Sequence, residues 1–368
     1  MKHSYTEKME DSLFQQWSID EEDYSGVRAI LDSEFRTFGE GLLDIMTAKY
    51  GKIDDPVSFI RGKANEQCIP FSAIGSLNTL KSWFHGGPRP KKGDTSRQSM
   101  FALAFALKLS IDETKVLFHK VYLDRAFDFR EPLDIVAFYC LSHNRNWSDA
   151  EYFLQQVVES AIEDHTVYTQ VLKDRVSALR EDLELIDFLQ RHQHNLTKQN
   201  VTAKQQLKKL LLKANSFAQK ELGSTAMEEQ FKGSDRSSNS FTYEMIIGVS
   251  PSGEKGTISL FKHAALPKEI RNRFPEAASF SRKNPTYEEL RKMIILLNSY
   301  IFWYQIQQQQ CQFDLEDYIA EMNAMMTECG FSELYMGNPY DWMFMYCTLN
   351  ERPLDVFRGL MLEVLEQE

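Results

Sequence analysis

Helix-start signals recur along the chain, and they constrain its fold more than any other feature of the sequence. Asp55-Pro56 places an N-cap side chain before a proline at the first helical position. Asn338-Pro339 opens another helix in the same way, and Arg352-Pro353 ends it and begins the helix at residues 354–365. The spacing of a capping box, a serine or threonine three residues before a glutamate, occurs at residues 110–113, 148–151 and 286–289. These signals predict a mainly helical protein.

Only one segment of the sequence favours β-structure. Residues 241–249 and 257–262 are β-prone and flank a Ser-Pro-Ser-Gly turn, which indicates a small hairpin. No other run alternates apolar and polar residues in the way that a sheet requires. The predicted fold class is therefore all-α, with at most a small β-hairpin near residues 241–262.

Composition shifts and helix boundaries divide the 368 residues into five predicted segments. An acidic N-terminal arm with a short helix occupies residues 1–33, and a helical domain occupies residues 34–128. A second helical domain at 129–231 contains a helix pair, 133–141 and 147–161, that could form a TPR-like hairpin. Residues 232–263 are expected to be a linker and the possible hairpin, and 264–368 a helical C-terminal domain.

Cysteine usage and hydropathy indicate the compartment in which the protein works. The 5 cysteines include no CxxC pair, which is typical of a reducing compartment. The polar N-terminus lacks the apolar segment of a signal peptide. The most apolar stretch, residues 293–306, is too short for a membrane span and is interrupted by Asn298, so it predicts a buried helix. We expect a cytoplasmic protein without a membrane partner.

The sequence lacks recognisable motifs for catalysis, cofactor binding or metal binding. Residues 248–255 resemble a phosphate loop, but Glu254 stands where that loop needs its lysine, so a hairpin turn is expected. His192 and His194 have no cysteine or carboxylate partner at helical spacing, which argues against a zinc site. Nucleophile-elbow and dinucleotide-binding fingerprints are also missing. We therefore predict no enzyme activity, no catalytic residues, no cofactor and no metal.

Residues 73–92 combine a short amphipathic helix with a cationic tail. Ser76 can N-cap a helix whose inward face carries Leu77, Leu80, Trp83 and Phe84. Its outward face carries Asn78, Thr79, Lys81, Ser82 and His85. An asparagine can hydrogen-bond adenine through two atoms, and serine bonds either base type, so this face suits contacts with base edges. Gly86-Gly87 ends the helix, and Arg89, Lys91 and Lys92 follow where phosphates would run.

With Thr79-Leu80, Trp83, Gly86 and Pro88 or Pro90, this segment resembles the recognition helix and turn of the phage-repressor (Xre/Cro-like) helix-turn-helix family. The flanks agree, with a first helix at 39–50, a scaffold helix at 56–66 and closing helices at 96–107 and 112–123. Residues 67–75, between the scaffold and recognition helices, form a longer connection than the family's tight turn. The resemblance covers about residues 34–125 and implies that 34–128 form a repressor-like DNA-binding domain.

Local charge favours the same function. Seven cations and two acids between residues 61 and 97 give a net charge of about +5, inside a chain whose net charge is −11. We predict a sequence-specific transcriptional regulator that binds double-stranded DNA as a homodimer, while the helical C-terminal part senses a signal or dimerises. The predicted DNA-binding residues are Ser76, Asn78, Thr79, Lys81, Ser82, His85, Arg89, Lys91, Lys92 and Arg97.

The alternative function is that of a helical protein- or peptide-interaction protein, such as a peptide-responsive regulator or a phage-defence or mobile-element component. The aromatic residues at 338–346 could anchor a peptide or protein ligand, although core packing is the favoured interpretation. Salt-dependent retention on DNA distinguishes the two classes.

Overall fold

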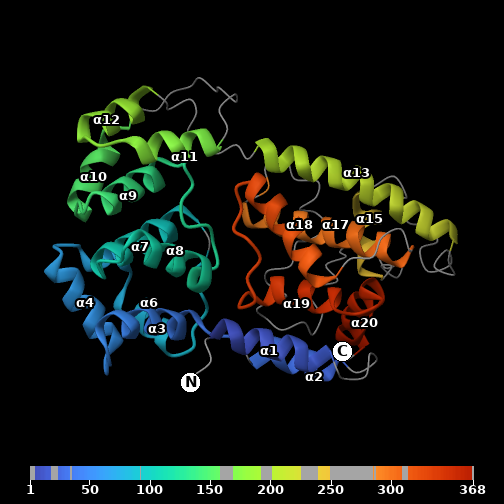
Figure 1. Cartoon of the computed structure of the whole chain (residues 1–368). Coiled ribbons are helices and arrows are strands. Elements are labelled where there is room, and N and C mark those ends of the chain that lie inside the picture. Colours follow the sequence, from blue (N-terminus) through green and yellow to red (C-terminus); the bar gives the residue numbers. More distant parts are fainter. Residues whose placement is uncertain are drawn as a thin grey trace, which may run out of the picture. The chain divides into compact units, whose positions relative to one another are not determined.

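The computed structural model describes residues 5–17, 24–33, 35–91, 93–157, 169–191, 201–224, 239–248, 285, 287–308 and 314–366 (Figure 1). Every regular element in these ranges is a helix, and they contain no strand. The all-α prediction is confirmed for this part of the chain. None of its helices is both long enough and apolar enough to cross a membrane.

The chain forms two compact units, and one of them is discontinuous in sequence. Residues 36–199 form the first, which we call the inserted unit, and residues 1–35 together with 200–368 form the second, which we call the outer unit. The predicted N-terminal arm, 1–33, thus belongs with the C-terminal helices. The predicted boundary near residue 128 lies inside the inserted unit, and residues 200–231 belong with the outer unit.

The inserted unit contains ten α-helices and one π-helical turn in its described ranges. They are α3 (Phe38–Tyr50), α4 (Pro56–Glu66), α5 (Phe71–Ile74), α6 (Leu77–Phe84), α7 (Asp94–Ala106), α8 (Ile111–Val116), η1 (Leu117–Tyr122), α9 (Pro132–Ser142), α10 (Trp147–Gln155), α11 (Thr169–Ala178) and α12 (Asp182–Arg191). Its core includes the fully buried Leu42, Phe101, Phe118 and Ile135, so the core joins residues on both sides of position 128. The helix pair expected at 133–141 and 147–161 is present as α9 and α10, although α10 ends at Gln155, before the predicted end.

Several of the predicted helix caps can be compared directly with the structure. The Asp55 carboxylate accepts hydrogen bonds from the backbone of Val57 and Ser58, and Ser110 and Glu113 form the expected capping box. The box predicted at Ser148 is wrong, because α10 begins two residues earlier. There the Asn146 Oδ1 accepts from the Asp149 amide at 2.9 Å, and Asp149 accepts from the Asn146 amide at 3.0 Å. The box predicted at 286–289 begins at a residue outside the described ranges.

The helix that starts as α8 changes pitch into the π-helical turn η1 before it ends. Leu123 then adopts a left-handed conformation, with φ of 59°. The Asp124 amide donates to the Phe118 carbonyl at 2.9 Å, which closes this end. The turn brings the Asp124 side chain towards Arg97 on α7.

The outer unit is built around one almost entirely buried helix, α17 (Tyr287–Gln307). Around it lie α1 (Tyr5–Trp17), α2 (Ser25–Ser33), α13 (Val201–Ser224), α15 (Asn239–Ile247), α18 (Leu315–Glu328), α19 (Pro339–Thr348) and α20 (Pro353–Glu366). The buried helix predicted at 293–306 is therefore confirmed. Residues of α19 are also buried throughout, so the aromatic side chains at 340–346 are core residues and not exposed anchors.

Two buried ion pairs connect the helices of the outer unit. Arg291 on α17 donates two hydrogen bonds of 2.8 Å to Asp341 on α19. Arg358 on α20 pairs with Glu221 on α13 at 2.5 Å, and the Tyr300 hydroxyl of α17 donates to the same carboxylate at 3.0 Å. Each buried charge has an opposite charge beside it, as burial of ionised groups requires.

The hairpin predicted near residues 241–262 is wrong in its first strand. Residues 239–247 form the helix α15, and all side chains from Phe241 to Ile247 are buried. The polar Thr242 and Glu244 alternate with Phe241, Tyr243 and Met245, which is the pattern of a strand with one buried face, but the structure buries both sets of side chains. Burial on every side suits a helix packed against α13 and α20, and tertiary packing overrides the β-propensity of the run. The second predicted strand, 257–262, lies outside the described residues.

Candidate nucleic-acid interface

Helix α6 is held against α3 by an unusually close contact. A Cβ placed on Gly39 would lie 2.1 Å from the Trp83 carbonyl oxygen, so only glycine allows α3 and α6 to approach this closely. The Trp83 ring packs edge-on against Phe38, with 4.8 Å between ring centroids. Trp83 and Leu80 are buried, as the sequence predicts. Leu77 is not, because 42% of it is exposed, and this part of the predicted inward face is wrong.

Both ends of α6 have well-formed caps. The Ser76 Oγ accepts from the Thr79 amide at 3.1 Å, which confirms Ser76 as the N-cap. At the other end Gly86 has φ of +74°, and the Gly87 amide donates to the Ser82 carbonyl at 2.7 Å, the bond that defines a Schellman motif. A Cβ on Gly87 would lie 2.0 Å from the Ser82 Oγ, so the second glycine is also required by space. The caps fix the length and orientation of the helix.

The outward face of α6 carries all five side chains that the sequence assigns to it, and all are exposed. Some of them have local partners: the Ser76 and Thr79 hydroxyls lie 2.8 Å apart, and the His85 Nδ1 lies 2.7 Å from the Lys81 carbonyl oxygen. Asn78 and the Lys81 ammonium make no hydrogen bond or ion pair with the residues that the structure describes. These two side chains have hydrogen-bonding capacity available for a ligand.

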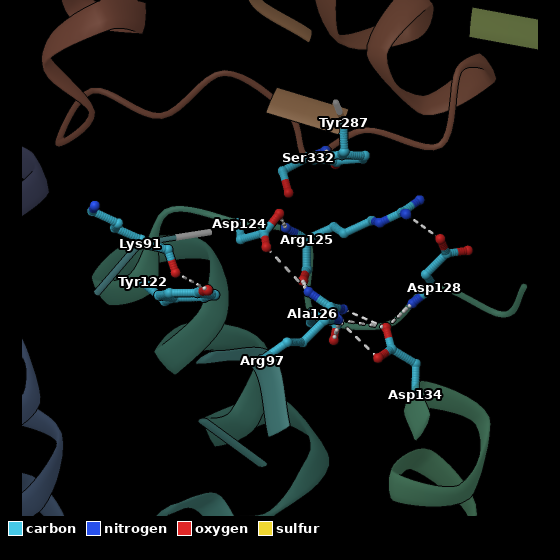
Figure 2. Close-up of polar contacts among 10 residues, drawn as sticks. All are labelled: Lys91, Arg97, Tyr122, Asp124, Arg125, Ala126, Asp128, Asp134, Tyr287 and Ser332. Carbon is cyan, nitrogen blue, oxygen red and sulfur yellow. Dashed lines mark hydrogen bonds and ion pairs between the residues drawn. The ribbon is translucent and has the colours of Figure 1, made fainter. Parts of the chain in front are cut away.

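The cationic tail after α6 is fixed at two points. Arg89 is half-buried, and its Nη2 donates to the Arg36 carbonyl at 3.0 Å. The Tyr122 hydroxyl donates to the Lys91 carbonyl at 3.1 Å, as Figure 2 shows. The Lys91 side chain is exposed, so its ammonium is accessible while its backbone is held. Lys92 lies outside the described residues.

Arg97 does not belong to this surface. Only 12% of its side chain is exposed, and its guanidinium lies among three helix ends (Figure 2). It donates to both Asp134 carboxylate oxygens, to Asp124 at 3.2 Å, and to the carbonyls of Arg125 and Ala126 at 3.0 and 2.9 Å. Burial alone would lower the pKa of Arg97, but the attraction of Asp134 and Asp124 outweighs it and raises that pKa above its usual range. The sequence-based assignment of Arg97 to the DNA-binding residues is therefore corrected to a structural ion pair.

Without Arg97, the surface around α6 has fewer cations than the sequence predicts. Lys63 is also paired, with Glu66 at 2.7 Å. The exposed cations that make no ion pair in the described part of this region are Arg61, Lys81 and Lys91. The surface is thus less basic than the sequence count indicates, and its positive charge is concentrated near α6.

The connection between α4 and α6 is longer than a tight turn and has a structure of its own. It contains α5, whose Ile74 is buried and which packs on α7. Hydrogen bonds from Ser58 are the main cause that lowers the pKa of Asp55, the N-cap of α4, and the charge of Lys81 contributes as well. Helices α4 and α6 contact each other, so the positive charge of Lys81 acts on the start of α4.

Comparisons with protein-family models, with curated proteins and with solved structures found no match.

Proposed function

We propose that the inserted unit binds double-stranded DNA and that the protein is a sequence-specific transcriptional regulator. The observation that carries the proposal is the outward face of α6, where Asn78 and Lys81 lie exposed on a helix that Trp83 and Gly39 hold firmly from behind. A recognition helix needs this combination, because base contacts require side chains available for bonding on a rigidly positioned helix. Lys91 adds a cation on a tail whose backbone is fixed.

In this proposal Asn78 and Ser82 contact base edges, since they are four residues apart and share one face. Lys81 and Lys91 contact phosphates and contribute affinity that does not depend on sequence. The acidic character of the whole chain keeps DNA from binding the rest of the protein unspecifically.

Selection from a randomised double-stranded DNA library tests the proposal. We expect the full chain to enrich one motif, and Asn78→Ala to flatten the preference at one base pair per half-site by about 1–3 kcal/mol. The matched control is Asn65→Ala, because Asn65 is an exposed asparagine on the neighbouring α4. No enriched motif for the full chain contradicts the regulator proposal, whereas one motif shared by the chain and its Asn78 variant contradicts only this residue assignment.

The phosphate contacts have a separate test in the salt dependence of binding. Lys91→Ala should weaken binding to all sequences alike and reduce the salt slope by about one unit. Lys115→Ala is the control, because Lys115 is exposed on α8 and pairs with Asp112 at 2.8 Å. If Lys91→Ala leaves the salt dependence of DNA binding unchanged, the cationic tail does not contact the phosphate backbone of the DNA. Absence of any salt-dependent retention favours the interaction-protein alternative.

A further inference from the structure

A row of lysines runs along the exposed side of α13. Lys209, Lys213 and Lys220 are exposed, with the exposed Ser216 between the last two. Steps of four, three and four residues place all four side chains on one side of the helix. None of these lysines forms an ion pair within the described residues, and the one acid of α13, Glu221, points inward to Arg358. We call these three lysines the basic row.

A row of acids with the same spacing runs along α18. Asp317, Glu321 and Glu328 are exposed, and the exposed Ala324 lies between the last two. The steps are again four, three and four residues, so each row carries a small residue at the same position. Helix α18 contains no lysine or arginine. We call these three residues the acidic row.

The two helices that carry these rows pack into one core. Phe217 of α13 stacks on Tyr304 of α17 with 4.6 Å between centroids, and Tyr318 of α18 lies 2.7 Å from Ser299 of α17 through their hydroxyl oxygens. The two helices are therefore fixed with respect to each other by α17. No ion pair joins the basic row to the acidic row within one copy of the described chain.

We propose that the basic row of α13 docks against the acidic row of α18 in a second copy of this chain. Each copy carries both rows, so a two-fold symmetric dimer makes the contact twice. Ser216 and Ala324 at matching positions let two helix backbones approach closely. Leu212, which is 67% exposed beside the basic row, adds an apolar contact that suits a protein partner better than a polyanion. This inference does not depend on DNA binding.

Single exposed ion pairs contribute little, so the dimer depends on the repeated rows together with Leu212. Salt should weaken it, because the screening length falls to about 3 Å at 1 M ionic strength. Charge-reversed variants give the sharpest test. The basic-row variant is Lys213→Glu with Lys220→Glu, and the acidic-row variant is Glu321→Lys with Glu328→Lys. Asp317 is left unchanged because it closes the cap of α18.

The molar mass of the full-length chains, measured by sedimentation, reports the outcome. We expect the parent chain to be a dimer and each variant alone to be a monomer. An equimolar mixture of the two variants should return to the dimer mass, because both rows of that mixed pair are again opposite in charge. The control, Lys52→Glu with Lys115→Glu, changes exposed lysines of the inserted unit and should keep the dimer mass.

A monomeric parent chain overturns the proposal, as does a dimer that persists in both variants. A mixture that stays monomeric also overturns it, provided that circular dichroism shows both variants folded. If the basic-row variant keeps the parent's mass but loses retention on heparin, the basic row binds a polyanion and not a second copy.

Discussion

Among the predicted site residues, Arg97 is the one for which the structure differs most from the sequence-based prediction. Its guanidinium holds Asp134, whose side chain is fully buried, together with Asp124. We expect Arg97→Ala to lower the free energy of unfolding by about 3–5 kcal/mol, because the Asp134 carboxylate is left buried without its partner. Urea denaturation measures the change. Adding Asp134→Asn to that variant should recover part of the loss, and a simple sum of two losses would contradict the pairing.

The cap of α10 offers a second comparison between neighbouring residues. Asn146→Ala should cost about 0.5–2 kcal/mol, because its side chain accepts the Asp149 amide at the helix start. Ser148→Ala should leave stability within about 0.5 kcal/mol, because Ser148 lies exposed within the helix. Thermal melting of the two variants decides between the caps, and a larger loss for Ser148→Ala would show that the helix begins later.

At the scale of elements, the crossing of α3 and α6 depends on the absence of a side chain. Gly39→Ala should destabilise the inserted unit by about 1–3 kcal/mol or more, because its Cβ meets the Trp83 backbone and separates the two helices. Gly62→Ala is the matched control, since nothing lies within 4 Å of a Cβ at this exposed position in α4. That control should gain up to about 1 kcal/mol from helix propensity. If denaturation shows the same change in unfolding free energy for both glycine variants, α3 and α6 do not approach each other as closely as the structure shows.

The two faces of α6 should respond differently to truncation. Trp83→Ala should cost about 3–5 kcal/mol, because Trp83 is 4% exposed and packs on Phe38. Leu77→Ala should cost well under that, because Leu77 already contacts solvent. Far-ultraviolet circular dichroism, which does not depend on the tryptophan signal, measures the unfolding of each variant. A Trp83 variant that melts like the parent would place this ring on the surface.

Local signals account for the elements that were predicted correctly. Helices α4 and α6 have the predicted starts because Asp55 and Ser76 satisfy backbone amides within three residues of themselves. The residues of α15 carry no such cap signal and alternate in the way of a strand, so their helix depends on neighbours distant in sequence. The role of Arg97 depends on Asp134, 37 residues away, which no local pattern indicates. The capped helix of the candidate site could therefore be predicted from the sequence. The pairing of its cations with acids distant in sequence could not.

At the scale of the whole molecule, residues 1–35 should be necessary for the outer unit and dispensable for the inserted unit. Met9, Leu13, Val27 and Leu31 are buried in the outer core, and the Trp342 indole donates to the Met9 carbonyl at 3.1 Å. Each such side chain contributes about 1.5–3 kcal/mol, so losing all four approaches the stability of a whole domain. Hydrogen exchange of a chain that lacks residues 1–35 should show α19 unprotected and α9 protected. Equal protection of both helices contradicts the two-unit division.

The same division sets the limits of a useful DNA-binding fragment. A fragment that ends at residue 128 lacks Asp134 and the rest of α9, so it leaves Arg97 without its main partner. A fragment of residues 36–199 keeps this ion pair and the whole core of the inserted unit. We expect the longer fragment to melt cooperatively and the shorter one to bind the hydrophobic dye that marks loose packing. Cooperative melting of the shorter fragment would show that α9 is not needed.

The discontinuity of the outer unit has a consequence for synthesis on the ribosome. Residues 1–35 leave the exit tunnel before residues 36–368, yet Trp342, against which Met9 packs, is made about 300 residues later. At roughly 5–20 residues per second, this delay lasts about 15–60 s. During that time the inserted unit can fold completely, whereas the apolar side of α1 remains exposed to water until α19 has been made. We therefore expect the nascent chain to expose a hydrophobic segment that a chaperone can bind, and folding to proceed from the inserted unit to the outer unit.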